Sequence, residues 1–144
     1  MATDTTDTTD TTDTNTSDPL TSGAPVGWFE IGTDDPESAR RFYGGAFGWT
    51  FAQEQSYSVI TTGQGHLLQG GIQDTTVPLP DGQPSSYAVP CVQVGDVAAT
   101  CAKVEDLGGK VLVPATPIPS GLVYGFVTDP AGNRIGLFAP PPLT

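Results

Sequence analysis

Basic residues are scarce in this 144-residue chain, which has five Lys and Arg against sixteen Asp and Glu. The formal net charge of −11 argues against a nucleic-acid partner, because binding the phosphate backbone requires Lys and Arg. Long hydrophobic runs are also missing. No stretch approaches the roughly 20 consecutive apolar residues of a membrane-spanning helix, so we expect no membrane partner.

Cysteine and histidine are equally scarce, with two Cys and one His in the chain. Cys91 and Cys101 are too few for a disulfide framework, and the N-terminus has neither the basic start nor the apolar core of a signal peptide. We therefore expect a reduced, cytoplasmic protein. His66 lies three residues before Gln69, so we expect it to face away from the side of the sheet that Gln69 occupies.

Aromatic residues are absent from residues 1–24, which contain a single leucine. Within this segment aspartates recur every three residues among threonines, at Asp4, Asp7, Asp10 and Asp13. Such a segment cannot bury enough apolar surface to offset its ordering entropy, so we expect a disordered acidic tail. A calcium loop is the functional alternative, but the glycine and bidentate glutamate of such a loop are missing. Residues 25–144 are expected to form a single folded domain.

The folded part begins with a strand that leads into a capped helix. Asp35 can accept from the free N–H groups of the first helical turn, and Pro36 suits the first helical position, where its missing N–H costs nothing. Gly48 supplies the left-handed conformation with which helices commonly end. Between these residues the apolar side chains recur at the spacing of one helical face. They are Ala39, Phe42, Tyr43, Ala46 and Phe47.

The same order of elements occurs twice, which predicts an α+β fold made of two tandem βαβββ units. Unit one covers about residues 26–73, a linker with several prolines covers 74–85, and unit two covers about 86–139. The two units are expected to pair their sheets into a curved, half-closed barrel of mixed strands with the helices outside. The expected helices span residues 35–47 and 97–107, and the expected strands span 26–33, 49–55, 57–62, 67–73, 87–94, 110–115, 122–128 and 134–138.

Several short runs of residues carry a family resemblance. They are Trp28-Phe-Glu-Ile, Asp35-Pro, Phe42-Tyr43, Phe47-Gly48-Trp49, Leu107-Gly-Gly-Lys and Asp129-Pro-x-Gly-Asn. With these runs, residues 26–139 resemble the vicinal-oxygen-chelate superfamily, which includes glyoxalases, bleomycin-resistance proteins, fosfomycin-resistance proteins and extradiol dioxygenases. The resemblance implies this superfamily's fold, which hosts many chemistries. It also implies a homodimer, since members with two units per chain often build each cavity from units of both partners.

Metal-dependent members of the superfamily place their ligands on the first and fourth strands of each unit. The resemblance assigns these four positions to Trp28, Gln69, Val89 and Gly136. Only the amide of Gln69 could donate an oxygen, whereas a divalent ion needs several His, Asp, Glu or Cys ligands. We therefore expect no metal site and no cofactor.

Glu30 lies two residues after Trp28, so it is expected on the same inward face of an otherwise apolar strand. A carboxylate there must be hydrogen-bonded, or its pKa rises. One interpretation is structural, with Glu30 accepting from loop N–H groups or from Arg40 or Arg134. The other is functional, with Glu30 as a general base or as a polar anchor for a ligand. We favour the structural role, because relatives with this type of first strand also carry glutamate there.

These features favour a metal-free domain that binds a small aromatic or amphipathic organic molecule, similar to the resistance or drug-sequestering members. The alternative is a metal-independent lyase, isomerase or cyclase that acts on a carbonyl compound with Glu30 as the catalytic base. A third hypothesis is a module that serves only in protein interactions. The candidate ligand-binding residues are Trp28, Trp49, Gln69, Tyr87, Val89, Tyr124, Phe126 and Gly136.

The acidic tail leads to a first testable prediction. Deleting residues 1–24 should leave the melting temperature of the protein nearly unchanged, because the segment has almost no apolar surface to bury. Thermal unfolding of the full chain and of the shortened chain measures the difference. A large drop in melting temperature would show that the tail docks on the domain.

Overall fold

The computed structural model describes residues 23–63, 68–80 and 83–142. Within these residues it contains two helices, α2 (Pro36–Phe47) and α3 (Val97–Asp106). His66 and most of the expected acidic tail lie outside the described residues. The strands are β2 (Val26–Thr33), β3 (Thr50–Glu54), β4 (Tyr57–Thr61), β5 (Gln69–Asp74), β6 (Tyr87–Gln93), β7 (Lys110–Pro117), β8 (Val123–Thr128) and β9 (Arg134–Ala139).

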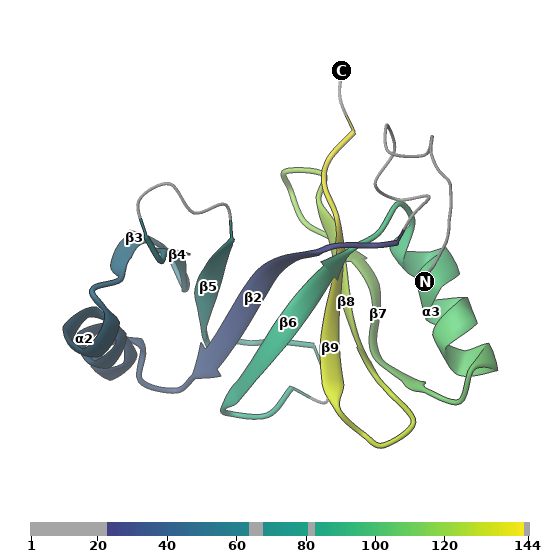
Figure 1. Ribbon diagram of the computed structural model, residues 1–144, viewed down its shortest axis with the longest axis horizontal. Helices are drawn as coiled ribbons and strands as arrows, with labels where there is room; N and C mark the ends of the chain where they lie inside the picture. The colour runs from purple at the N-terminus through teal and green to yellow at the C-terminus, as the bar shows by residue number, and fades with distance from the viewer. Residues whose placement is uncertain (1–22, 64–67, 81–82, 143–144) are drawn as a thin grey trace, which may run out of the picture.

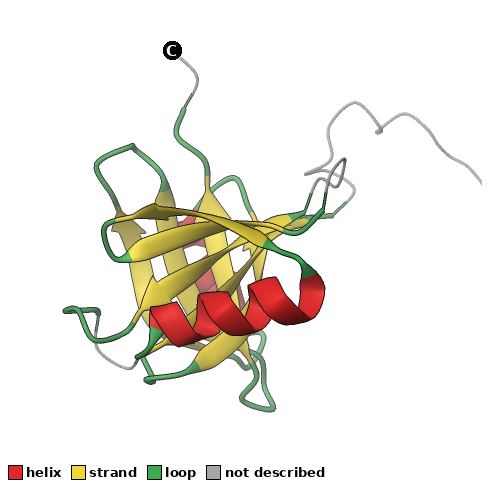
Figure 2. Ribbon diagram, turned by 90° about the vertical axis from the view of Figure 1, so that its left-hand side faces the viewer, coloured by secondary structure: helices red, strands yellow, loops and turns green. Residues whose placement is uncertain are grey.

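The strands form one mixed, eight-stranded sheet in the order β3-β4-β5-β2-β6-β9-β8-β7. In each unit the first strand pairs in parallel with the fourth, as β2 with β5 and β6 with β9. The two units join where β2 and β6 run antiparallel, side by side across the middle of the molecule (Figure 1). The sheet is curved and does not close, and the helices lie outside it (Figure 2). The predicted α+β fold with two βαβββ units is therefore confirmed.

Both helices begin at an aspartate cap, and that of α2 is the predicted Asp35. The Asp35 carboxylate accepts from the Ser38 N–H at 3.1 Å, and Gly48 ends α2 in the left-handed conformation with φ 74°. Asp96 caps α3 in the same way, accepting from the Ala99 N–H at 3.0 Å. Within the described residues, neither helix has the length and apolar character needed to span a membrane.

The side chains of the sheet divide between a helix-bearing face and the opposite face, which we call the inner face. Beneath α2 the buried residues are Ile31, Ile60 and Ile72. A separate cluster that includes Val97 and Cys101 lies beneath α3. The buried residues of the inner face are Val89, Cys91, Val113 and Phe126, packed against half-buried aromatic side chains. The inner face therefore has an apolar floor of its own, although neither α2 nor α3 covers it.

Two glycines on the inner face leave room for tyrosine side chains that cross neighbouring strands. A methyl group at Gly71 in β5 would overlap the phenol of Tyr57, and one at Gly32 in β2 would overlap the ring of Tyr87. Tyr57 lies on β4, two strands away from β2. Because Gly71 has no side chain, the phenol of Tyr57 can cross β5 and reach β2.

The close approach at Gly71 predicts a stability effect. We expect Gly71→Ala to lower the free energy of unfolding by about 1–3 kcal/mol, the usual cost of adding volume to a filled site. Gly45→Ala is the matched control, because the added methyl group would have nothing within 4 Å. There the gain in helix propensity should raise stability by up to roughly 1 kcal/mol. Equilibrium urea denaturation measures both variants, and a Gly71→Ala protein as stable as the parent would contradict the packing described here.

Candidate functional site

The carboxylate of Glu30 lies at the centre of the candidate site, on the inner face of β2. The hydroxyl of Tyr57, from β4, donates to Glu30 Oε1 at 2.9 Å. The hydroxyl of Tyr87, from β6, donates to Glu30 Oε2 at 2.6 Å. Strands from both units therefore supply one donor to each carboxylate oxygen, and Glu30 lies beside the junction of β2 and β6.

A third hydrogen bond extends this arrangement. The indole Nε1–H of Trp28 donates to the hydroxyl of Tyr57 at 2.9 Å. Tyr57 therefore accepts from Trp28 while it donates to Glu30, and the single proton of its hydroxyl is committed to the carboxylate. Hydrogen bonds to a charged acceptor are stronger than hydrogen bonds between neutral groups. The linked hydrogen bonds from Trp28 to Tyr57 and from Tyr57 to Glu30 therefore fix the orientation of the Glu30 carboxylate.

The surroundings of Glu30 act on its pKa in opposite directions. Removal from water raises it, whereas the hydrogen bonds from Tyr87 and Tyr57 and the positive charge of Arg134 lower it. The loss of hydration is the largest effect, and the pKa of Glu30 is raised above its ordinary value of 4.5. Burial and the nearby Glu30 charge raise the pKa values of both tyrosines and bring the pKa of Cys91 to about 12. At neutral pH both phenols and the thiol therefore keep their protons.

Arg134 is the cationic residue that acts on Glu30. It begins β9, and its guanidinium lies over the rings of Tyr87 and Phe126, with Cζ 5.6 Å and 5.4 Å from their centroids. Its Nη1 also donates to Gln83 Oε1 at 2.7 Å. Burial lowers the pKa of Arg134, an effect that the neighbouring Tyr87 and Glu30 oppose. The guanidinium is thus held in a fixed orientation against aromatic faces.

The structure brings most of the predicted site residues together. Glu30 lies on the inner face beside the buried residues of that face and their aromatic neighbours, and Gln69 pairs with Trp28 in the parallel register of β2 and β5. Trp49 lies elsewhere. Its ring stacks on Tyr43 and packs against Phe29 on the helix-bearing face, so it is not a neighbour of Glu30. The predicted residues that share the inner-face cluster are Trp28, Tyr87, Val89, Tyr124 and Phe126.

Sequence reasoning missed Tyr57 as a site residue. Its strand was predicted, but the partner of Glu30 was expected to be a loop N–H group or an arginine. Arg40 instead donates to Ser58 Oγ at 3.1 Å, away from Glu30, whereas Arg134 acts on the carboxylate through its charge. The available signal was Gly71 in the neighbouring strand. A glycine that pairs with Glu30 leaves space for a side chain from the strand beyond it.

The register also reassigns one of the four positions that the resemblance gives to metal ligands. Gly136 pairs with Cys91, just as Gly71 pairs with Glu30 in unit one. The counterpart of Gln69, two residues before Gly71, is therefore Arg134 and not Gly136. An arginine cannot ligate a cation, and no group of three or more His, Cys, Asp or Glu residues suited to a metal occurs among the described residues. These residues do not fit a divalent metal ion.

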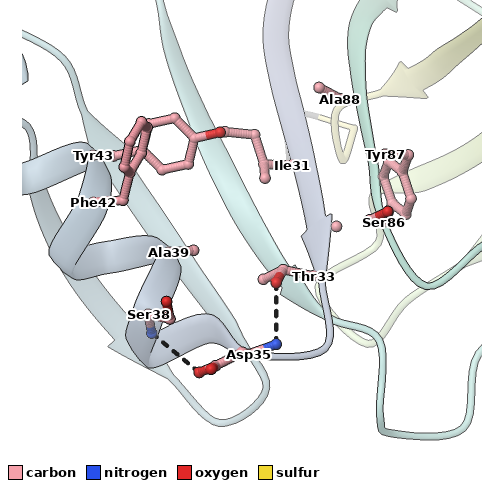
Figure 3. Close-up of a pocket in the computed structure, with 11 residues that line it drawn as sticks. Ile31, Thr33, Asp35, Ser38, Ala39, Phe42, Tyr43, Ser86, Tyr87 and Ala88 are labelled. Atoms are coloured by element: carbon pink, nitrogen blue, oxygen red, sulfur yellow. Dashed lines mark hydrogen bonds between the residues drawn. The ribbon is translucent and has the colours of Figure 1, made fainter. Parts of the chain in front are cut away.

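A groove of about 560 Å³ opens between α2 and the start of β6, where Tyr87 also contributes to its lining (Figure 3). Its lining includes Ile31, Ala39, Phe42 and Tyr43, and its one carboxylate is that of Asp35. Because Asp35 already caps α2, as the dashed line to the Ser38 nitrogen shows, it has a structural task there. We place the candidate site at Glu30, where several polar groups converge, and not in this groove.

Comparison with known proteins places the fold among established relatives. Residues 26–137 match the family described as Glyoxalase/Bleomycin resistance protein/Dioxygenase superfamily. Proteins named "Putative glyoxylase CFP32" from Mycobacterium bovis and Mycobacterium tuberculosis are each 31% identical over 120 residues, which cover 77% of this chain and 44% of theirs. The chain thus spans less than half the length of these relatives.

Two solved structures with the same fold show low sequence identity to the chain. Methylmalonyl-CoA epimerase from Mycobacterium tuberculosis has a TM-score of 0.55 at 17% identity, covering 80% of this chain and 87% of its own. A structure described as NAD-dependent benzaldehyde dehydrogenase from Legionella pneumophila has a TM-score of 0.59 at 14% identity, covering 78% and 96%. At these identities the likeness shows the fold alone.

The raised pKa of Glu30 predicts a pH dependence of stability. Between 4.5 and the folded-state pKa, the folded protein binds more protons than the unfolded chain, so stability falls as pH rises through this window. Glu30→Gln lacks the titrating group. The stability of the parent relative to Glu30→Gln should therefore fall across this window and stay constant below it.

Urea denaturation of both proteins over a pH series measures this difference. The control is Glu37→Gln, which removes a negative charge from an exposed side chain of α2. A stability difference between the parent and Glu30→Gln that rises with pH above 4.5 would contradict the raised pKa.

Proposed function

Because the chain belongs to the glyoxalase/bleomycin resistance protein/dioxygenase superfamily, we propose that its inner face binds a small organic molecule without a metal ion. Glu30 is the polar anchor in this proposal. The observation that carries it is the fixed carboxylate, which accepts from Tyr57 and Tyr87 on an otherwise apolar and aromatic surface. A few fixed polar groups on an apolar, aromatic surface are typical of small-molecule sites.

The aromatic residues around Glu30 supply the binding surface. Trp28, Tyr87 and Tyr124 are half-buried, so part of each side chain stays accessible to a ligand. Tyr87 and Tyr124 both contact the buried ring of Phe126 edge-on, with centroids 5.9 Å and 6.1 Å away. Such packing holds the aromatic rings in place, which lowers the entropy lost on binding. A protein that sequesters its ligand needs a surface of this kind and no reacting group.

A second candidate function is proton transfer by Glu30. The raised pKa of its carboxylate favours this alternative, because a general base works best when its pKa lies near the working pH. The reaction would be that of a lyase, isomerase or cyclase acting on a carbonyl compound. The relatives named as glyoxylases are in keeping with an enzyme, although the chain spans only part of their length.

The proposal includes the setting in which the protein works. Both described cysteines are free thiols, which suits a reduced cytoplasm. The sheet ends in two edge strands, β3 and β7, and uncovered edges favour pairing with another chain. We therefore infer a cytoplasmic homodimer. The two units of one chain already share the inner face through β2 and β6, so the partner is not needed to complete the site.

The proposed function is tested by a thermal-shift screen of small organic molecules with the parent, Glu30→Gln and the control Glu37→Gln. A ligand that stabilises the parent should bind Glu30→Gln about tenfold more weakly or worse, since a hydrogen bond to a charged group contributes about 1.5–3 kcal/mol. Glu37→Gln should bind like the parent. Elemental analysis should find no stoichiometric divalent metal.

Turnover assays with the identified ligand distinguish the two candidate functions. If Glu30 is a general base, Glu30→Gln should lose about 10²–10⁴-fold in turnover while it still folds and binds. If the protein only binds its ligand, the parent should convert none of it. Full affinity and full turnover in Glu30→Gln, or one equivalent of metal in the parent, would overturn the proposal.

A further inference from the structure

We propose that the ligand of the inner face carries a hydrogen-bond donor that meets Glu30 and an anionic group that meets Arg134. Small hydroxyaromatic acids represent this class. The inference rests on the proposed function, because it describes the molecule that the same site would bind. It adds a second ligand contact, at Arg134. It also states which chemical group the ligand must present to each of the two residues.

Tyr87 sets the spacing between the two contacts. Its hydroxyl donates to Glu30 Oε2 at 2.6 Å, and its ring lies under the guanidinium of Arg134, with the centroid 5.6 Å from Cζ. Glu30 and Arg134 therefore lie at the hydroxyl and at the face of one aromatic ring. A molecule about as long as a phenol matches this spacing and can reach both residues.

The hydrogen bonds around Glu30 determine what its end of the ligand must offer. The hydroxyl protons of both Tyr57 and Tyr87 are donated to the carboxylate. A phenol has only one proton, so these groups present acceptor oxygens to any further partner. The ionised carboxylate is itself acceptor-only. The ligand group that meets this cluster must therefore be a donor, such as a hydroxyl or an N–H group.

Arg134 determines what the other end must offer. A guanidinium has only donors and a permanent positive charge, and its planar fork matches carboxylate geometry. The rings of Tyr87 and Phe126 and the side chain of Gln83 hold this group in one orientation. Arg134 also occupies the unit-two position equivalent to Gln69 in unit one. An anionic ligand group thus meets a fixed cation at the position that the strand register makes equivalent to Gln69.

Four related probes test the two requirements separately on the full chain. 4-Hydroxybenzoate carries both groups, benzoate lacks the donor, phenol lacks the anion, and 4-methoxybenzoate replaces the donor by an acceptor. Two-dimensional NMR titration in about 0.1 M salt, which screens distant charges beyond roughly 10 Å, gives the affinity and the location of each probe. We expect 4-hydroxybenzoate to bind the inner face with millimolar affinity and the other three roughly tenfold more weakly.

A variant of Arg134 tests whether the anionic group of the probe binds at this residue. Arg134→Gln should weaken 4-hydroxybenzoate roughly tenfold and leave phenol unchanged, because only the former has an anionic group. The matched control is Arg41→Gln, which removes a positive charge from an exposed side chain of α2 that pairs only loosely with Glu37, at 3.7 Å. It should leave both affinities unchanged. Because the four-probe series on the parent is informative by itself, the test does not depend on Arg134→Gln being folded.

The outcomes separate this inference from the proposed function. Equal binding of all four probes on the inner face, or equal losses of phenol and 4-hydroxybenzoate in Arg134→Gln, would overturn the ligand class and leave the binding site standing. Shifts confined to the α2 side of the groove, at residues such as Ala39 and Phe42, would overturn both. Absence of 4-hydroxybenzoate binding at tens of millimolar would overturn the inference, while the thermal-shift screen would still decide the proposed function.

Discussion

The inner face depends on one interaction, the pair of hydrogen bonds from Tyr57 and Tyr87 to the Glu30 carboxylate. A carboxylate removed from water is costly unless donors replace the lost hydration. Here each carboxylate oxygen accepts a hydrogen bond from one tyrosine hydroxyl, and the two tyrosines come from different units. The arrangement in turn requires small residues beneath the phenols, and Gly71 and Gly32 meet that requirement. The chemistry of the site and the packing of the sheet therefore depend on each other.

The two units share a fold but not a site. In the antiparallel register of β2 and β6, Trp28 faces Cys91 and Glu30 faces Val89. Counted back from the helix caps Asp35 and Asp96, the counterpart of Glu30 is Cys91, whose pKa of about 12 keeps its thiol protonated. Unit one thus contributes the negative charge and unit two contributes the positive charge of Arg134. In the proposed function, this polarity along the face would give a bound molecule a defined orientation.

The fold was predictable because local signals agreed with one another. Asp35, Pro36 and Gly48 marked the first helix, and the second unit repeated the order of elements. The inward direction of Glu30 followed from strand alternation alone. The partners of Glu30 did not, because they depend on which strands become neighbours and on a side chain that crosses β5. Trp49 illustrates the same limit, since its place under α2 depends on its packing with Tyr43 and Phe29.

The most direct test is a carbon-13 NMR titration of the Glu30 carboxyl group in the parent, in Tyr57→Phe and in the control Tyr43→Phe. Tyr43 packs on Trp49 at the helix-bearing face, so its hydroxyl does not act on Glu30. The pKa of Glu30 should lie above 4.5 in the parent. It should rise further in Tyr57→Phe, which removes a donor to the ionised form, and stay unchanged in Tyr43→Phe. A Glu30 pKa at or below 4.5 in the parent, or one that Tyr57→Phe leaves unchanged, would contradict the account.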